Sequence, residues 1–221
     1  MTSMFEPKKV FELVPEGIYD ARLIWILDLG THQDIFDGVT RYKRSLYLGW
    51  ELIGTAMTDG RPFMVGKEYT ITNGKYGPYI AKTSNLFKLL RAWQKWDEKQ
   101  AGRVSSLGGL LAVMAPASIS VAHEPNKKDA TKTNVILEMI KAAKKDPAPA
   151  VNLPMSYEVG EDFPEHLPDW VKKKVQTCCE NTGGIPKTEA QEDEPGEPPV
   201  GERHTDPYQL PDDMTDNDIP F

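Results

Sequence analysis

The stretch Arg41-Tyr42-Lys43-Arg44-Ser45-Leu46-Tyr47-Leu48-Gly49-Trp50-Glu51-Leu52-Ile53 sorts its side chains into two alternating sets. Such alternation predicts a β-strand with one face on an apolar core. The set expected to face the core is Leu46, Leu48, Trp50 and Leu52. The opposite set carries two cations and one aromatic ring, and consists of Arg41, Lys43, Ser45, Tyr47 and Glu51. The stretch therefore predicts a sheet with one buried face and one cationic face.

Two flanking segments are predicted to be neighbouring strands. The first runs from Gly17 to Leu29 and has the apolar phase Tyr19, Ala21, Leu23, Trp25 and Leu27. Gly30 and the polar stretch from Thr31 to Thr40 are predicted to form the turn that follows it. Asp59-Gly60-Arg61-Pro62 is typical of a turn, and Phe63 to Asn73 is predicted to be the third strand.

A helix is predicted next. Ser84 is a typical N-cap residue, and the helix from Asn85 to about Gln100 has an apolar face of Leu86, Leu89, Leu90, Trp93 and Trp96. A fourth strand is predicted near Leu110 to His123, opened by Gly108 and Gly109. Asn134 to Ala143 is predicted to be a fifth strand, although a helix from Asn134 to Lys145 is the alternative by residue propensity.

Three strands, a helix and two strands follow the order of an OB-fold, a five-stranded barrel whose helix lies between strands three and four. We therefore predict a mainly β, OB-fold nucleic-acid-binding domain for residues 1-146. Residues 147-180 are predicted to be an extension whose short helix, Leu167 to Val175, packs on the barrel. Residues 181-221 consist mainly of Pro, Gly, Glu and Asp. This composition buries too little apolar area to offset the entropy of ordering, and predicts a disordered acidic tail.

The net charge of −7 averages two opposite regions. Residues 181-221 hold eleven acidic and two basic side chains, a net charge of −9. Residues 41-103 hold twelve basic and five acidic side chains, a net charge of +7. The overall acidity therefore does not exclude nucleic acid as a partner, because the basic segment is a separate region.

A protein that holds single strands without recognising their sequence needs cations for the phosphates and flat rings for the bases. In an OB-fold, the face of strands two and three and the adjoining loops provide them. The predicted single-stranded DNA contacts are Arg41, Lys43, Tyr47, Lys67, Lys75, Tyr76, Tyr79 and Lys82.

Each aromatic candidate also has a packing alternative. Tyr47 could instead pack across strands, and Tyr76 and Tyr79 could hold the loop from Asn73 to Tyr79 in place. Lys172 to Lys174 could contact phosphate, but a solvated helix face is favoured. Four tryptophans on apolar phases are expected in the core: Trp25, Trp50, Trp93 and Trp96.

Catalysis and metal binding find little support. The four histidines lack metal-ligand spacing, and the common phosphate-loop and hydrolase motifs are absent from the sequence. Carboxylate pairs such as Asp20 with Asp28, or Glu161 with Asp162, leave a metal-dependent nuclease as a remote alternative. We expect no enzyme activity, cofactor or metal.

Adjacent Cys178 and Cys179 suggest a reducing compartment, and no apolar run is long enough to span a bilayer, so a soluble, cytoplasmic protein is expected.

The last nine residues are Asp213-Met214-Thr215-Asp216-Asn217-Asp218-Ile219-Pro220-Phe221. Repelling aspartates prevent this tip from folding alone, yet a basic pocket could bind its aromatic ring, its terminal carboxylate and its aspartates. The predicted partner-binding residues are Asp213, Asp216, Asp218, Ile219, Pro220 and Phe221. The alternative is that the acidic tail only keeps the protein soluble and binds no partner.

The ending Asp-Asn-Asp-Ile-Pro-Phe closely resembles the acidic tip of bacterial single-stranded DNA-binding proteins. The resemblance implies that the tip recruits replication, recombination and repair proteins, and that it competes with DNA for the protein's own basic surface. A more diffuse resemblance, over about residues 10 to 180, is to phage-encoded OB-fold single-stranded DNA-binding proteins. It rests on Thr83-Ser84-Asn85-Leu86, Trp93, Leu107-Gly108 and Leu167-Pro168-Asp169-Trp170-Val171, and the sequence departs from it around Lys75 to Tyr79.

These observations predict a single-stranded DNA-binding protein that coats and protects strands in phage replication or recombination and recruits partners through its tip. The alternative is an adaptor that occupies replication or repair proteins through the tip without binding DNA.

Overall fold

A computed structural model describes residues 12–74, 77–103, 106–126 and 129–183. Backbone contacts divide the chain into two units, Met1–Lys187 and Thr188–Phe221. The second unit lies outside the described residues, and so do the predicted partner-binding residues of the tip.

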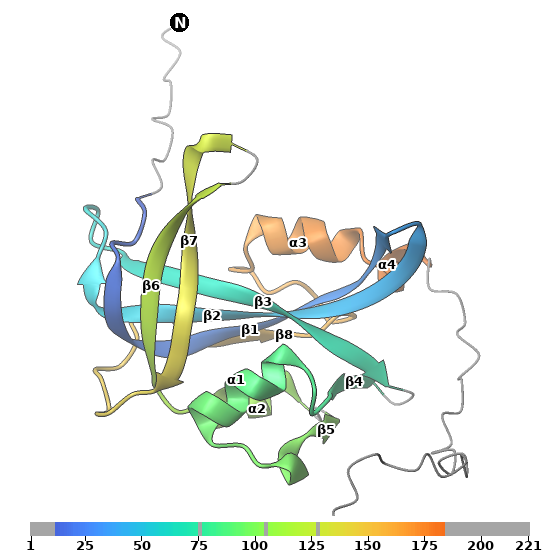
Figure 1. The fold of residues 1–221 in the computed structure, drawn as a ribbon, viewed down its shortest axis with the longest axis horizontal. Helices are drawn as coiled ribbons and strands as arrows, with labels where there is room; N and C mark the ends of the chain where they lie inside the picture. Colours follow the sequence, from blue (N-terminus) through green and yellow to red (C-terminus); the bar gives the residue numbers. More distant parts are fainter. Residues whose placement is uncertain (1–11, 75–76, 104–105, 127–128, 184–221) are drawn as a thin grey trace, which may run out of the picture. The chain divides into compact units, whose positions relative to one another are not determined.

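Within the described residues, seven strands form one path in the order β5-β4-β3-β2-β1-β6-β7, each antiparallel to its neighbours (Figure 1). An eighth strand, β8, pairs in parallel with β1. The strands are β1 (Gly17–Phe36), β2 (Val39–Ala56), β3 (Pro62–Gly74), β4 (Gly77–Ile80), β5 (Gly102–Arg103), β6 (Ala117–Asn126), β7 (Asp129–Ala142) and β8 (Met155–Tyr157). The fold is mainly β, as predicted.

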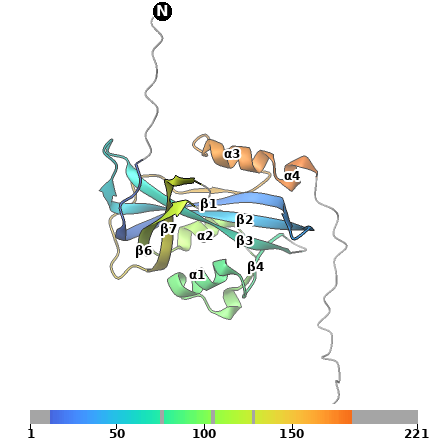
Figure 2. The ribbon, with the colours of Figure 1, turned by 45° about the horizontal axis from the view of Figure 1, so that its top comes forward.

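Short helices lie on both sides of this sheet. They are α1 (Asn85–Gln94), the 3-10 helix η1 (Glu98–Gln100), α2 (Leu107–Val113), α3 (Asp169–Gln176) and α4 (Cys179–Thr182). Figures 1 and 2 show α3 and α4 on one side of β1, β2 and β3, and α1 on the other. Both faces of the central strands are therefore covered.

The prediction of a turn from Thr31 to Thr40 is wrong. β1 continues to Phe36 and β2 begins at Val39, so that the two strands form one long hairpin. The turn is only Asp37-Gly38, and both residues have positive φ, 52° and 73°. An Asp-Gly pair suits this tight hairpin turn. The polar residues on either side belong to a two-stranded arm rather than a loop.

The helical region also differs from the prediction. The helix expected to reach Gln100 ends at Gln94, because Lys95 adopts a left-handed conformation with φ of 56° and caps it. The fourth strand expected from Leu110 starts at Ala117, since Ser106 caps α2 by accepting a hydrogen bond from the Gly109 N–H. The fifth strand is confirmed within β7, and the helical alternative there is wrong.

A closed five-stranded barrel is not confirmed. β1, β2, β3, α1, β6 and β7 follow the predicted order, and β6 pairs with β1, but β3 and β7 have no hydrogen-bonded pairing in the described part of the chain. Side chains from other segments line the gap between these two strands. Asn85 and Leu89 of α1 line one end of the gap, and Leu13 and Val14 line the other.

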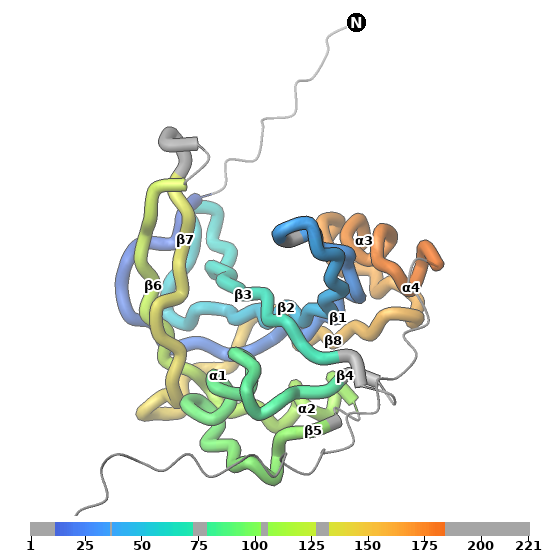
Figure 3. The backbone as a smooth tube through the Cα atoms, turned by 45° about the vertical axis from the view of Figure 1, so that its right-hand side comes forward, coloured from blue at the N-terminus to red at the C-terminus, as the bar shows by residue number. Residues whose placement is uncertain are grey.

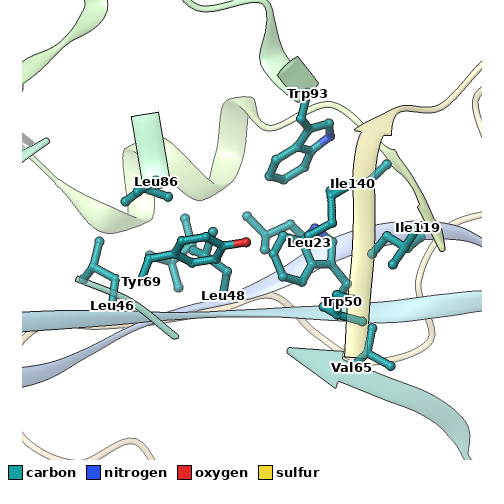
Figure 4. Close-up of a cluster of buried hydrophobic side chains, with 14 of the residues drawn as sticks. Leu23, Leu46, Leu48, Trp50, Val65, Tyr69, Leu86, Trp93, Ile119 and Ile140 are labelled. Carbon is teal, nitrogen blue, oxygen red and sulfur yellow. The ribbon is translucent and has the colours of Figure 1, made fainter. Parts of the chain in front are cut away.

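The main core lies between the sheet and α1. Leu46, Leu48, Trp50 and Leu52 are all buried, which confirms the predicted core phase of β2. Figure 4 shows Trp50 and Trp93 approaching each other from the sheet and from α1. Their ring centroids lie 5.6 Å apart. Trp50 and Trp93 are thus confirmed as core residues, whereas Trp25 and Trp96 are only half-buried at the edges of the clusters.

Gly66 of β3 makes room for an aromatic ring on the other face of the sheet. It pairs with Gly49 of β2, and a Cβ built on Gly66 would lie 2.0 Å from the Tyr47 hydroxyl oxygen. Any side chain at position 66 must therefore displace Tyr47.

We expect Gly66→Ala to lower the free energy of unfolding by about 1 to 3 kcal/mol, the usual cost of overpacking. Urea denaturation measures this change. Gly109→Ala is the matched control, because a Cβ there meets its nearest atom at 3.7 Å and alanine favours the helix. Equal midpoints for Gly66→Ala and wild type would contradict the close packing of Tyr47 on Gly66.

Candidate nucleic-acid interface

The polar face predicted for β1 and β2 is largely covered by residues 147–183, here called the C-terminal extension. Leu27 and Leu29 of β1 form a second buried cluster with side chains of the extension, and Tyr47 packs against it. The extension contributes Tyr157, Leu167, Val171, Val175 and Cys178. The short helix thus packs on the sheet, and Ser45, Tyr47 and Glu51 of the expected cationic face are wholly or partly removed from solvent, whereas its two cations, Arg41 and Lys43, stay exposed.

Glu51 shows how a polar residue of β2 can be buried. Its side chain is 1% exposed. The carboxylate accepts hydrogen bonds from the Val151 N–H at 2.6 Å, the Asn152 N–H at 2.8 Å and the Asn152 side-chain amide at 2.7 Å. Buried carboxylates are tolerated when they are hydrogen-bonded in this way. Glu51 therefore anchors the start of the extension.

A buried ion pair anchors the end of the extension. Asp28 is 1% exposed and forms a salt bridge with Arg44 across the β1–β2 hairpin. Its carboxylate also accepts from the Gly30 N–H at 3.0 Å and from the Val159 N–H of the extension at 3.3 Å. Burial would lower the pKa of Arg44, but its hydrogen bond with Asp28 and the charge of Asp28 raise it. Arg44 therefore stays charged.

Glu180 of α4 joins the same network. Its carboxylate accepts from the Thr31 N–H at 2.8 Å and from the Thr31 hydroxyl at 2.6 Å, and lies 3.9 Å from Arg44. Burial alone would raise the pKa of Glu180, but the hydrogen bonds from Thr31 lower it below its ordinary value of 4.5. Gly30 permits the close approach, because a Cβ there would lie 2.6 Å from the Cys178 Cβ.

Tyr47 lies beneath this extension. Its ring is half-buried and makes an edge-to-face contact with Trp170 of α3, with ring centroids 4.9 Å apart. Burial also raises the pKa of its hydroxyl. The packing alternative therefore describes the observed contacts of Tyr47, and base stacking on Tyr47 stays a prediction.

Arg41 and Lys43 are exposed on the distal part of the β1–β2 hairpin, where Lys43 forms a salt bridge with Asp34. Tyr42, between them, is 39% exposed. Tyr42 was not among the predicted DNA contacts, although its position between two cations in the sequence was the available signal. Because successive side chains of a strand point to opposite faces, the arm presents the Tyr42 ring on one face and Arg41 and Lys43 on the other.

Lys67, Tyr79 and Lys82 lie on β3, on β4 and just before α1. Tyr79 is 37% exposed, and Lys82 is exposed and bridges Glu98 at 3.0 Å. The Lys67 ammonium lies 6.0 Å from the centroid of the buried Tyr69 ring, and burial raises the pKa of Tyr69 to about 12. Lys75 and Tyr76 lie outside the described residues.

A cleft of about 610 Å³ separates β3 from β7. Its walls are Lys67 to Thr72 of β3, residues around the start of α1, and Leu137, Glu138 and Ile140 of β7. Hydroxyl groups, one ammonium group, two carboxylates (Glu68 and Glu138) and apolar side chains line it, a mixture that can hold a sugar or a base. Figure 3 shows the β1–β2 and β6–β7 hairpins projecting to the same side of the sheet.

The structure therefore places the predicted contacts in three locations. Arg41 and Lys43 are on the hairpin arm, Tyr47 is beneath the extension, and Lys67, Tyr79 and Lys82 belong to β3, β4 and the turn before α1. Two of these locations contain exposed cations and an exposed ring within a few residues of the sequence. The part of the β2 face that was expected to be central to DNA binding, around Tyr47, is covered by the C-terminal extension.

Among the described residues, no three side chains of His, Cys, Asp or Glu gather as a metal site would require. No helix in that part of the chain is both long and apolar enough to span a membrane. No model of a known protein family, no curated protein sequence and no solved structure matches the chain.

The network at Glu180 predicts a pH dependence of stability. Since folding lowers the pKa of Glu180, its carboxylate contributes stability above about pH 4.5 and loses it as the pH falls through the lowered pKa. We expect Glu180→Gln to cost about 1 to 3 kcal/mol at pH 7 and progressively less in acid. Urea denaturation of both proteins between about pH 7 and about pH 3 measures the difference.

Thr31→Val is the companion variant. It removes the hydroxyl donor to Glu180, so the pH-dependent part of the difference should shrink when Glu180→Gln is made in that background. A difference between wild type and Glu180→Gln that is constant over the pH range would contradict the role assigned to these hydrogen bonds.

Proposed function

We propose that the chain binds single-stranded DNA, coats and protects it during phage replication or recombination, and recruits partner proteins through its acidic C-terminal tip. The observation that carries this proposal is that exposed rings and exposed cations occur within a few residues of each other at two places. Tyr42 lies between Arg41 and Lys43 on the hairpin arm, and Tyr79 lies on β4, shortly before Lys82. Rings for bases and cations for phosphates are what a sequence-independent single-strand site needs.

The connectivity of the sheet supports the same proposal. A β1-β2-β3 meander, a helix, and a β6–β7 hairpin with β6 against β1 is the connectivity of an OB-fold. We propose that the sheet derives from this barrel and is open between β3 and β7. Because folds do not determine functions, this support is an analogy and carries less weight than the exposed residues.

The proposed DNA path differs from the one expected at the sequence level. The extension covers the strand-two face, so the path runs over the hairpin arm and along β3 and β4, beside the cleft lined by Lys67. Because Tyr47 is covered by the extension, it does not lie on this path, and Tyr42 and Tyr79 are the proposed stacking residues.

The adaptor is the second candidate. The covered strand-two face favours it, since a protein that works only through its tip has no need of an open sheet surface. The basic segment with interleaved tyrosines favours DNA binding, because an adaptor does not require it. A direct binding measurement separates the two.

We expect fluorescence anisotropy of labelled oligothymidine to report tight binding that weakens as salt rises, because phosphate contacts release counterions. Tyr79→Ala should weaken binding about fivefold to a hundredfold, the usual effect of losing one stacking ring. Phe163→Ala is the matched control: Phe163 is also 37% exposed, but it follows Glu161 and Asp162 in an acidic segment. Lack of binding at low salt, even after removal of the tail, would sink the DNA proposal and leave the adaptor.

Removal of residues 213-221 should leave DNA affinity equal or higher and abolish co-purification of replication proteins. The tail carries −9 and residues 41-103 carry +7, so the tail should compete with DNA for the basic segment. Replacing Ile219, Pro220 and Phe221 by alanine is the control, since it keeps the charge: partners should be lost while DNA affinity stays at the wild-type value. A large loss of DNA affinity on truncation would contradict the competition.

A further inference from the structure

Trp170 is exposed in a way that the other tryptophans are not. Trp50 and Trp93 are buried, Trp25 and Trp96 are half-buried, and Trp170 is 44% exposed on the surface of α3. A single exposed apolar side chain is common and indicates nothing by itself. Whether Trp170 belongs to a binding site therefore has to be judged from the residues around it.

The packing of α3 does not need the exposed part of Trp170. Val171 and Val175 are fully buried and, with Leu167, fill the cluster against β1. Trp170 instead contacts Tyr47 edge to face, with ring planes at 72°. This contact holds the indole in position while leaving much of it in solvent. A ring that is already held in place loses little conformational entropy when a ligand binds.

Positively charged residues follow Trp170 in α3, and Lys173 and Lys174 share its side of the helix at the i+3 and i+4 positions. α3 contains three successive lysines, Lys172, Lys173 and Lys174, and one acidic residue, Asp169. Lys172 lies 3.7 Å from Asp169, and Lys174 lies 2.5 Å from Glu68 of β3. Ion pairs at the surface contribute little net stability, so phosphate groups can replace these carboxylates. Lys173 is exposed and belongs to no ion pair within the described residues.

We propose that α3 is a second contact site for single-stranded DNA, in which Trp170 stacks on a base and Lys172 to Lys174 bind the adjoining phosphates. The inference rests on the proposed function and extends it to an element outside the sheet. α3 covers the polar face of β2 and presents on its own outer surface the ring and the cations that this face was expected to provide. Figures 1 and 3 show α3 on the side of the sheet toward which the β1–β2 hairpin projects. A single DNA strand can therefore contact both α3 and the hairpin.

An acidic peptide is the competing ligand for a basic surface. It would satisfy the lysines, but it offers no flat group for the indole face. Bases offer one at every nucleotide, so the combination of ring and lysines favours single-stranded DNA.

The test uses the full-length protein and unlabelled oligothymidine, with intrinsic tryptophan fluorescence as the readout. Stacking on a base quenches an indole, and Trp170 is the most exposed of the five. Wild type should be quenched on titration. Trp170→Phe should lose most of the quenching while keeping most of the affinity, and Trp96→Phe, the control, should keep the quenching. Trp170→Ala should bind oligothymidine at least about fivefold more weakly. Lys173→Ala should reduce the slope of log affinity against log salt concentration by about one.

The outcomes separate the inference from the proposed function. Absence of oligothymidine binding to wild type in the anisotropy experiment would overturn both. Wild-type binding with unchanged quenching in Trp170→Phe and unchanged affinity in Trp170→Ala would overturn the role of α3 alone. Quenching by a peptide of residues 213-221, without quenching by oligothymidine, would make α3 an acidic-peptide site and also overturn it. Trp170→Phe keeps an aromatic ring against Tyr47, so the result does not depend on Trp170→Ala folding.

Discussion

The burial of Asp28 between β1 and the C-terminal extension is the constraint on which the arrangement of the chain depends. A carboxylate that is 1% exposed needs compensating charge and donors, and Arg44, Gly30 and Val159 supply them. Because such a pair is costly to break, its partners must stay together. Arg44 therefore connects β2 to β1, and through Glu180 it also connects the sheet to α4.

This anchoring has a direct consequence for function. Once the extension lies on β1 and β2, Leu27 and Leu29 are buried on the second face of the sheet, and Tyr47 supports Trp170 from below. The surface available to a ligand moves outward to the hairpin arm, to β4 and to α3. The polar phase of β2 thus serves folding, and the exposed rings that could serve binding lie on the elements around it.

Sequence patterns predicted the parts of the fold that depend on local periodicity. Leu46, Leu48, Trp50 and Leu52 occupy the core because alternation in a strand places them on one face. The errors have equally local causes. The segment from Thr31 to Thr40 looked like a turn because polar residues in an exposed two-stranded arm resemble a loop, and Leu110 looked like a strand residue because Ser106 was not recognised as a helix cap. For the candidate site, Tyr79 is exposed, as a DNA contact must be, whereas the exposed rings of Tyr42 and Trp170, now proposed as contacts, were not selected from the sequence.

The sequence by itself determined that the chain forms amphipathic strands, that a basic segment is separate from an acidic tail, and that the chain ends in a short apolar and acidic tip. Charge, periodicity and turn chemistry are properties of neighbouring residues, so one sequence is enough to show them. Only the tertiary structure decided that Glu51 and Asp28 are buried and that Tyr47 is covered. A polar side chain in a strand can face water or a partner from a distant segment, and hydrogen bonds such as those from Asn152 to Glu51 exist only after the chain has folded back on itself.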